Sequence, residues 1–353
     1  MLRNWRQRVT FTDIVVWAIG LVLAAGVVYG TIVTLRAQIY SGTTWISLAI
    51  TGLALGGVYA LIALGYTLVY GILKMINFAH GEVFMSGPFT AVFLAIYLDN
   101  TGFLNTNPII SILLITILSA VVATTIAILL ERIAYKPIRG APRLVPLITA
   151  IGASFFLQYT FRGLYGSGLK AYPEIDILQG SFQIGDVSII KTQAVSIVGA
   201  VLMMLVIYAI SRFTRVGKAM RAVSEDKEVS ALMGIDVDRT IMNTFALGGA
   251  AAGVAGILYV LLFPVVNFFM GFIPGLKAFT AAVLGGIGNP IGAFLGAMVL
   301  GLIEAIGPSL FLTGLGIPAP YQLKDALAFI ILVLILIFRP TGILGERLSR
   351  TKA

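Results

Sequence analysis

The chain has 353 residues, of which 59% are hydrophobic and only 11% are charged. Because an ordinary globular domain carries about 25% charged residues, this composition excludes a water-soluble protein. The absence of cysteine excludes disulfides, iron–sulfur clusters and thiolate zinc sites, and the single histidine, His80, excludes a histidine-rich metal site. We therefore expect neither a metal nor a cofactor.

The net charge of +9 would also suit a nucleic-acid-binding protein. The basic residues do not form one wet face, however. They lie in short segments between long apolar runs, as the positive-inside rule describes for membrane proteins. We expect a protein that lies among membrane lipids and does not bind nucleic acid.

The first predicted membrane span covers residues 14–35 and follows Arg3, Arg6 and Arg8. At a rise of about 1.5 Å per residue it is long enough to cross a hydrocarbon core of about 30 Å. A cleaved signal peptide is the alternative, but its apolar region would be only about 7 to 15 residues long and would precede a small-x-small cleavage site. Further apolar runs cover residues 45–73, 83–98, 109–130, 144–161, 194–211, 241–263, 276–307 and 326–338.

The charged connections indicate the orientation. With a cytoplasmic N-terminus, alternation of the spans places the basic connections 131–143 and 212–239 inside. The connection 99–108 contains no Lys or Arg and falls outside. The basic residues that follow the last span are expected inside: Arg339, Arg347, Arg350 and Lys352.

A single crossing at 276–307 would leave the C-terminus outside. This run is interrupted by Gly285-Gly286-Ile287-Gly288-Asn289-Pro290, in which the glycines and Pro290 disfavour a helix. We therefore predict two half-helices that enter from the outer side and return to it; a kinked ordinary helix is the alternative. Since broken backbone at membrane depth needs protein or a water-filled cavity around it, the break should lie beside a substrate path.

A faint internal repeat connects two parts of the chain. Ala54-Leu55-Gly56-Gly57 is followed some twenty residues later by Asn77-Phe78-Ala79-His80-Gly81, and Ala246-Leu247-Gly248-Gly249 is followed similarly by Asn267-Phe268-Phe269-Met270-Gly271. The two copies lie on spans of opposite direction, which is typical of the inverted repeats of transporters. Chance matching in a chain with 39 glycines is the alternative.

No motif of an enzyme stands out. The chain lacks the phosphate loop G-x-x-x-x-G-K-[ST], an H-E-x-x-H motif and a pair of close carboxylates within the predicted spans. We therefore expect that the chain is not an enzyme.

The connection 212–239 contains a short predicted helix. Ser224 is expected to be its N-cap, with Glu225 and Asp226 in the first turn and Gly234 as the C-terminal stop. The spacing of three further residues predicts a small apolar face, formed by Val229, Leu232 and Met233. So short a helix is marginal in water, so it needs a protein partner; an ordinary solvated connector is the alternative.

Five segments together resemble a known family: residues 52–71, 75–83, 221–235, 282–293 and 338–345. They are similar to the branched-chain amino acid ABC transporter permeases of the LivH type, and the resemblance extends from about residue 45 to 345. The Asn-Phe-Ala-His-Gly-Glu run at 77–82 favours this type over the sister LivM type, which lacks it. The span 14–35 is an addition to the usual shorter permease.

The resemblance implies an all-α polytopic membrane protein with eight or nine spans, including the broken pair. It implies an importer subunit that moves branched-chain or related amino acids inward by alternating access. The implied partners are two ABC ATPase subunits, a second permease of the LivM type and an external solute-binding protein. The implied location is a bacterial-type plasma membrane, with both termini cytoplasmic.

Three parts of the chain follow from this assignment: an N-terminal stub with the additional span (1–44), the permease domain (45–345) and a cytoplasmic tail (346–353). Within the permease domain, residues 221–235 resemble the loop of the family that contacts the ATPase, and the cytoplasmic coupling loop covers 212–240. The expected coupling residues are Arg221, Ser224, Glu225, Asp226, Val229, Leu232, Met233 and Gly234.

The candidate substrate path follows from polar and glycine residues near the ends and breaks of the spans. His80 and Glu82 are ionisable groups at the inner end of a span, where they serve a proton relay or a structural hydrogen bond. Asn77 caps a helix or contacts the substrate, and the glycines permit close packing or an unwound backbone. Half-helix N-termini at the break could bind a substrate carboxylate. The predicted path comprises Asn77, His80, Gly81, Glu82, Asn267, Gly285, Gly286 and Asn289.

Residues 181–190 alternate around Gly185-Asp186, which predicts an outer β-hairpin that helps to dock the binding protein. Three alternative functions stay open. They are a proton-coupled secondary transporter that uses His80 and Glu82, a urea or amide permease of the same superfamily, and a membrane scaffold without transport.

Overall fold

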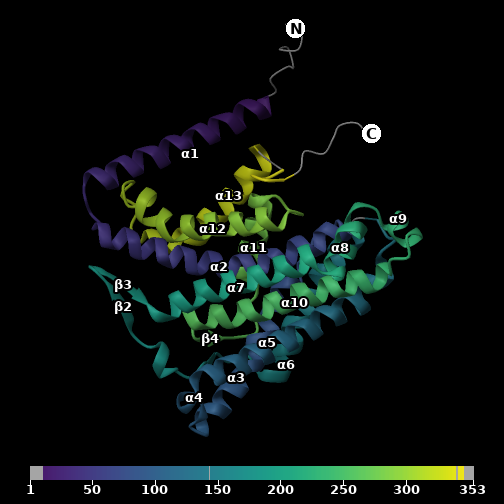
Figure 1. Cartoon of the computed structure of the whole chain (residues 1–353). Coiled ribbons are helices and arrows are strands. Elements are labelled where there is room, and N and C mark those ends of the chain that lie inside the picture. Colours follow the sequence, from purple (N-terminus) through teal and green to yellow (C-terminus); the bar gives the residue numbers. More distant parts are fainter. Residues whose placement is uncertain (1–10, 143, 339–340, 346–353) are drawn as a thin grey trace.

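The computed structural model describes residues 11–142, 144–338 and 341–345 (Figure 1). The predicted tail 346–353 lies outside the described residues, as do Arg3, Arg6, Arg8 and Arg339. The thirteen α-helices of the described part are α1 (Phe11–Arg36), α2 (Gly42–Leu73), α3 (His80–Asn100), α4 (Phe103–Thr106), α5 (Pro108–Leu129), α6 (Leu144–Tyr165), α7 (Lys191–Phe213), α8 (Arg215–Glu225), α9 (Lys227–Leu232), α10 (Val237–Leu262), α11 (Phe272–Gly285), α12 (Pro290–Gly307) and α13 (Lys324–Phe338). Its strands are β1 (Lys170–Ala171), β2 (Ser181–Ile184), β3 (Val187–Ile190) and β4 (Val265–Val266).

The helices confirm the expected polytopic architecture. Among the residues that the structure describes, nine helices are long and apolar enough to cross a membrane, and the first of them includes residues 17–36. The additional N-terminal span is therefore a helix of sufficient length, as expected. Helix α11 is shorter than these nine, as expected for half of a broken pair, whereas α12 belongs to a segment long enough to cross a membrane, so its prediction as a half-helix is wrong.

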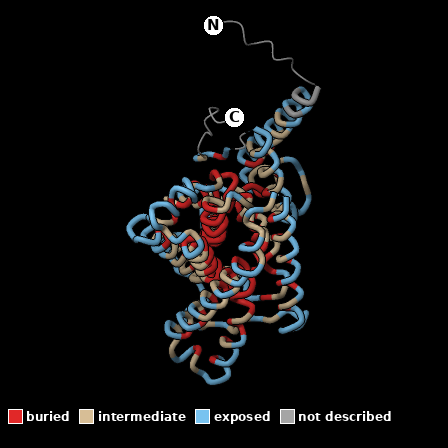
Figure 2. The backbone as a smooth tube through the Cα atoms, turned by 90° about the vertical axis from the view of Figure 1, so that its right-hand side faces the viewer, coloured by how far each residue is buried: buried red, intermediate tan, exposed pale blue. Residues whose placement is uncertain are grey.

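The centre of the bundle is formed by α2, α3, α10 and α12, whose residues are largely buried (Figure 2). Small residues allow these helices to approach closely. Gly52 of α2 packs on the backbone of α12 at Gly301, and Gly56 packs on it at Ala297. Because apolar lipid gives helices no hydrophobic reason to associate, such close backbone packing supplies much of their attraction.

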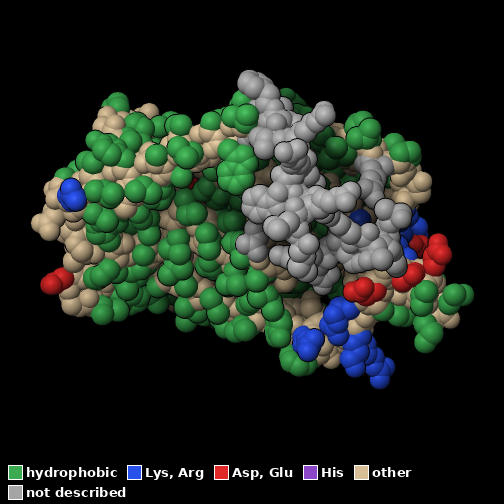
Figure 3. All heavy atoms as spheres, turned by 90° about the horizontal axis from the view of Figure 1, so that it is seen from above, with side chains coloured by type: hydrophobic (Ala, Val, Ile, Leu, Met, Phe, Trp, Pro, Cys, Tyr) green, Lys and Arg blue, Asp and Glu red, His purple; other side chains and the backbone are tan. Residues whose placement is uncertain are grey.

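The outer helices turn their large apolar side chains outward. In α1, Trp17 and Leu21 are exposed, and in α7 Leu202 is exposed. Figure 3 shows a hydrophobic surface across the middle of the molecule, with charged side chains gathered mainly at one end. We name this end, which carries α8, α9 and the connection after α5, the basic end (Figure 1).

The strands cap the opposite end of the bundle. Strands β2 and β3 pair antiparallel, with Ile184 opposite Val187 across the turn, and Gly185 has a left-handed φ of 61°. The predicted hairpin at 181–190 is thus confirmed. Strand β1 pairs with β4 and ties the loop after α6 to the loop after α10.

The break between α11 and α12 is also confirmed, which excludes a kinked continuous helix. Gly286 and Gly288 have φ values of 104° and 101°, and Asn289 caps α12 through its side chain. The break packs against residues 341–345. The Ile343 N–H donates to the Leu284 carbonyl (2.8 Å), and the Leu344 N–H donates to the Gly285 carbonyl (3.0 Å). The break lies beside α8, near the ends of α2 and α7, so its predicted position at membrane depth is wrong. Residues 341–345 bond the carbonyl groups that the break leaves free.

Asn289 makes the contact that holds this arrangement together. Its Oδ1 accepts from the N–H groups of Ile291 and Gly292 (both 3.1 Å), and its Nδ2 donates to the Leu344 carbonyl (3.1 Å). We expect Asn289→Ala to lower the stability by about 1–2 kcal/mol, because it removes a helix cap and a hydrogen bond. Thermal unfolding of the purified protein in detergent measures this loss. Asn289→Ser retains the cap and should lose less; equal loss in both variants would contradict the role of the cap.

The predicted inverted repeat agrees with the helix packing. Helices α2 and α12 pack together, as do α10 and α5, and α3 packs on α5 as α11 packs on α12. The two copies of the repeated motif meet in space, since Gly81 and Gly271 lie in backbone contact. In this pairing α2, α3 and α5 correspond to α10, α11 and α12.

Candidate functional site

Two polar regions of the described chain contain predicted site residues. One is a buried group around the start of α3, and the other is the segment α8–α9 at the basic end. The structure places the predicted substrate-path residues partly in the first region and partly at the break near the second.

Glu82 lies in the first turn of α3 and is buried. Its Oε1 accepts hydrogen bonds from Gln158 Nε2 (2.6 Å) and Ser154 Oγ (3.3 Å), both on α6. Its Oε2 is buried and has no hydrogen-bond partner among the described residues. A buried carboxylate with one free oxygen is unusual, because removing such a group from water is costly without full pairing.

His80 faces the other way. Its ring lies against Gly65 of α2 and meets the Tyr66 ring edge-on, with the centroids 5.0 Å apart. Its Nε2 finds no hydrogen-bond partner in the part of the chain that the structure describes, and no hydrogen bond joins it to Glu82 there. In this geometry His80 and Glu82 therefore cannot share a proton directly.

The predicted position of these residues at the inner end of a span needs correction. Gly65, beside His80, lies eight residues before the end of α2 at Leu73, which is a depth of about 12 Å at 1.5 Å per residue. The reason is that the non-helical residues 74–79 turn back into the bundle before α3 begins. The sequence could not show this return, because the segment is short and mostly apolar.

Neither asparagine of the repeated motif caps a helix with its side chain. Asn77 Oδ1 accepts a hydrogen bond from Tyr135 Oη (2.5 Å), and the N-cap of α3 is Ala79. Asn267 Oδ1 accepts from the Phe269 N–H (2.8 Å) and closes a local turn. The capping alternative for Asn77 is thus wrong, whereas a contact with substrate stays a prediction.

A cavity of about 230 Å³ lies where the starts of α3 and α11 meet. Its polar lining includes Glu82, Ser154 and Tyr66. Its other lining residues are apolar or glycine: Phe78, Gly81, Ile151, Phe155, Gly271, Phe272, Gly275 and Leu276. We name it the α3–α11 cavity.

The break residues belong to a different place. Gly285 packs on Gly292, and Gly286 packs on Gly345, so their lack of a side chain serves close contact. Asn289 lines a separate cavity of about 320 Å³ at the basic end, together with Arg221 and Glu225 of α8. The structure therefore brings Gly81, Glu82 and Gly271 together and keeps Gly285, Gly286 and Asn289 apart from them.

Sequence reasoning missed a buried ion-pair group on the central helices. Lys277 Nζ lies 2.7 Å from Glu304 Oε1 of α12 and 2.6 Å from Asp325 Oδ1 of α13. Tyr59 of α2 donates to the same Glu304 oxygen (3.3 Å). The signal was available, since Lys277 and Glu304 interrupt apolar runs just as His80 and Glu82 do.

At the basic end, the predicted coupling helix has a different boundary. Helix α8 continues to Glu225, so Ser224 lies in its last turn, where its Oγ donates to the Arg221 carbonyl (2.7 Å). The N-cap of α9 is Asp226, whose carboxylate accepts from the N–H groups of Glu228 (2.9 Å) and Val229 (3.0 Å). The prediction of Ser224 as the cap was wrong. Ser224 and Asp226 can both accept hydrogen bonds at a helix start, but Asp226 has the extended backbone conformation that an N-cap requires.

Helix α8 itself was missed, although a pattern marks it. Gly217, Met220 and Val223 recur every three residues and are buried, so α8 packs on the bundle. Thr214 caps it through the Gly217 N–H (3.1 Å). Gly234 ends the following segment with a φ of 83°, as predicted.

The short helix α9 presents an exposed apolar face. Val229, Leu232 and Met233 are 54%, 86% and 77% exposed, so the small face that the sequence predicts points away from the protein. Burial lowers the pKa of Lys227 at the start of α9, and the positive charges of Arg139 and Lys74 lower it further.

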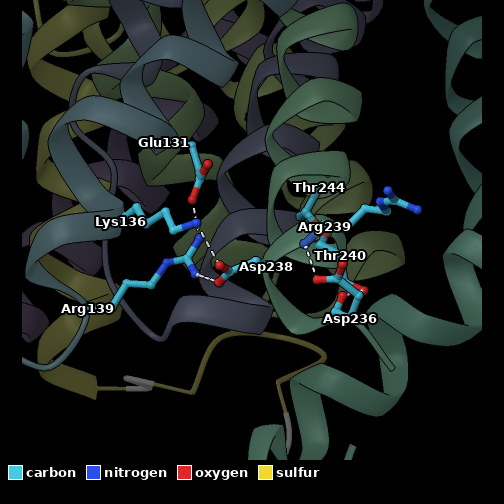
Figure 4. Close-up of polar contacts among 8 residues, drawn as sticks. All are labelled: Glu131, Lys136, Arg139, Asp236, Asp238, Arg239, Thr240 and Thr244. Atoms are coloured by element: carbon cyan, nitrogen blue, oxygen red, sulfur yellow. Dashed lines mark hydrogen bonds and ion pairs between the residues drawn. The ribbon is translucent and has the colours of Figure 1, made fainter. Parts of the chain in front are cut away.

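An ion-pair network anchors the adjoining connection to α10 (Figure 4). Arg139 pairs with both Glu131 and Asp238, and Lys136 Nζ lies 2.7 Å from Asp238 Oδ2. Arg239 points away from these groups (Figure 4). Several charges in one network hold their geometry better than a single surface pair, so the base of the α8–α9 segment is fixed to the bundle.

Comparisons with known proteins agree with this arrangement. The family described as branched-chain amino acid transport system / permease component matches residues 48–336. The chain is 43% identical over 302 residues to the high-affinity branched-chain amino acid transport system permease protein BraD of Pseudomonas aeruginosa, covering 84% of this chain and 94% of that protein. It is 41% identical over 300 residues to LivH of Escherichia coli, with the same coverage. A partial similarity, 29% over 140 residues, connects it to a probable LivM permease of Methanocaldococcus jannaschii, covering 38% of this chain and 41% of that protein.

Proposed function

Because the chain belongs to the branched-chain amino acid transport permease family, we propose that it carries branched-chain amino acids inward as one permease subunit of an ABC importer. The chain contains no nucleotide-binding phosphate loop, so the energy comes from separate ATPase subunits and the chain itself is not an enzyme. The exposed apolar face of α9 is the observation that carries this proposal. Such a face on a short helix needs a protein partner.

The proposed assembly contains two ATPase subunits, a second permease of the LivM type and an external solute-binding protein. The ATPases contact α9 and the end of α8, including Arg221, Glu225 and Asp226. The binding protein docks at the opposite end, where the exposed hairpin β2–β3 lies. A movement of the ATPases is then transmitted to the helix bundle, which opens the path to one side of the membrane and then to the other.

The proposed orientation places the basic end in the cytoplasm of a bacterial-type plasma membrane. Lys136, Arg139, Lys218 and Arg221 lie at this end, as the positive-inside rule requires. With the proposed parts 1–44, 45–345 and 346–353, this orientation puts both termini in the cytoplasm.

Proton-coupled transport through His80 and Glu82 is the second candidate. It draws support from the buried Nε2 of His80 and Oε2 of Glu82, which lack hydrogen-bond partners among the described residues. A urea or amide permease differs from the first proposal in its substrate alone, and the same uptake assay separates the two.

The test is uptake into proteoliposomes that contain the complete complex. With the binding protein outside and ATP inside, we expect accumulation of labelled leucine that persists when a protonophore collapses the proton gradient. ATPase subunits with an inactive nucleotide site serve as the control and should abolish uptake. Uptake that survives this change but disappears with the protonophore would establish the proton-coupled transporter instead, and uptake of urea in place of leucine would establish the amide permease.

A further inference from the structure

We propose that the α3–α11 cavity binds the amino acid during its passage, with Glu82 as the partner of the substrate's ammonium group. This inference rests on the proposed transport function and names the place where this chain recognises its substrate. The observations that carry it are a buried carboxylate with a free oxygen, a cavity of matching size and an apolar lining.

Three glycines in the lining of the cavity let the two helix starts approach closely. Gly81 of α3 lies in backbone contact with Gly271, and Gly275 of α11 packs on Gly81. A side chain at any of these positions would collide with the facing backbone. Two helix starts thus lie side by side in the interior of the bundle.

The charge of Glu82 calls for a cation that the protein does not supply. Gln158 and Ser154 occupy Oε1, which fixes the carboxyl group on the α6 side. Oε2 stays without a partner, and no Lys, Arg or His of the described chain lines the cavity. Because a buried carboxylate is stabilised by a paired charge that also donates hydrogen bonds, an ammonium group with three N–H donors is a suitable partner.

The rest of the lining suits an aliphatic amino acid. Phe78, Phe155, Phe272 and Leu276 provide apolar walls, as small-molecule sites commonly do around a few placed polar groups. A volume of about 230 Å³ has room for roughly eight water-sized groups at about 30 Å³ each. This is comparable with valine or leucine.

The substrate carboxylate has its own counterpart. The N-termini of α3 and α11 both lie at the cavity, and the positive end of a helix dipole favours an anionic group. A bare metal cation fits less well, because it prefers several oxygen ligands and most of this lining is aromatic or aliphatic. A zwitterion with an apolar side chain uses all three features.

The experiment compares wild type, Glu82→Gln and Glu82→Asp in the complete reconstituted complex. We expect Glu82→Gln to reduce ATP-driven leucine uptake by about 30-fold or more, because it removes one member of a buried charge pair. Glu82→Asp keeps the charge and should retain a measurable part of the uptake. The ATPase subunits should co-purify with both variants in the same amounts as with the wild type, which shows that the complex is folded and assembled.

A binding measurement separates recognition from a structural role. Phe155→Trp places a fluorescent reporter in the cavity wall, and the complex with Phe155 provides the background signal. We expect leucine and isoamylamine, which carries the ammonium group alone, to shift the emission, whereas isocaproate, which lacks it, should not. The added change Glu82→Gln should abolish the response to isoamylamine.

The outcomes are distinct. If wild type accumulates leucine and Glu82→Gln does so equally well, or if the amine response persists in Glu82→Gln, the inference is overturned while the transport function stands. If Glu82→Gln loses uptake together with assembly, and the reporter responds to isocaproate as well as to the amine, the inference is also overturned. If wild type itself shows no ATP-driven uptake, the proposed function fails first and the inference fails with it.

Discussion

Replacing Lys277 with methionine should lower the free energy of unfolding by about 3–5 kcal/mol, which is the usual loss when one partner of a buried ion pair is removed. Lys277 and Glu304 are each 3% exposed, and the lysine also pairs with Asp325. Without the ammonium group, Glu304 keeps a buried charge whose only other described partner is the Tyr59 hydroxyl. Helices α2, α11, α12 and α13 would lose their common contact.

Thermal unfolding in detergent measures this effect, with the yield of folded monomer from size-exclusion chromatography as a second readout. The double variant Lys277→Met with Glu304→Gln is the control. It removes the unpaired charge and keeps the volume, so it should recover a large part of the stability. If Lys277→Met unfolds at the same temperature as the wild type, the buried ion-pair group contributes nothing to stability.

Replacing Leu232 with aspartate should abolish coupling to the ATPases and leave the fold unchanged. Leu232 is 86% exposed and lies at the centre of the apolar face of α9. A carboxylate there would have to be desolvated in the proposed interface, and a central contact of this kind commonly costs 2 kcal/mol or more, which is about 30-fold in affinity. We therefore expect the ATPases to be lost on co-purification, and ATP-driven uptake to fall to background.

The matched control makes the same change at Leu169, which is 72% exposed and lies in the loop before β1 at the opposite end. Leu169→Asp should retain the ATPases in full. Equal loss of the ATPases in both variants, or their full retention in Leu232→Asp, would rule out α9 as the ATPase contact. The thermal unfolding of Leu232→Asp should match that of the wild type, because an exposed side chain contributes little to the fold.

Hydropathy and turn residues predicted much of the fold. The spans follow from apolar length, the hairpin from alternation around Gly185-Asp186, and the break from glycines followed by Pro290. These features depend on local chemistry, which a sequence displays directly. The boundary at Ser224 failed because Asp226 is an equally good cap two residues later, and the choice between them depends on how α8 packs on the bundle.

The candidate site was harder to predict because it depends on contacts between distant segments. Glu82 stands out as an ionisable residue in an apolar chain, yet its partners Ser154 and Gln158 lie more than seventy residues away. The group around Lys277 has the same character, since it joins residues from four helices. A sequence indicates that such residues are expensive to bury; it does not indicate which of them meet.

The contact between residues 342–345 and the α11–α12 break has a mechanical consequence. This contact holds the turn beside α8 in place. Helix α11, with fourteen residues and a length of about 21 Å, then moves as one rigid helix. One end of α11 leads to the cavity that Arg221 and Glu225 of α8 line, and its other end lines the α3–α11 cavity beside Glu82. In the proposed assembly, a movement of the ATPases at the basic end would therefore reach the proposed substrate site through the displacement of this one helix.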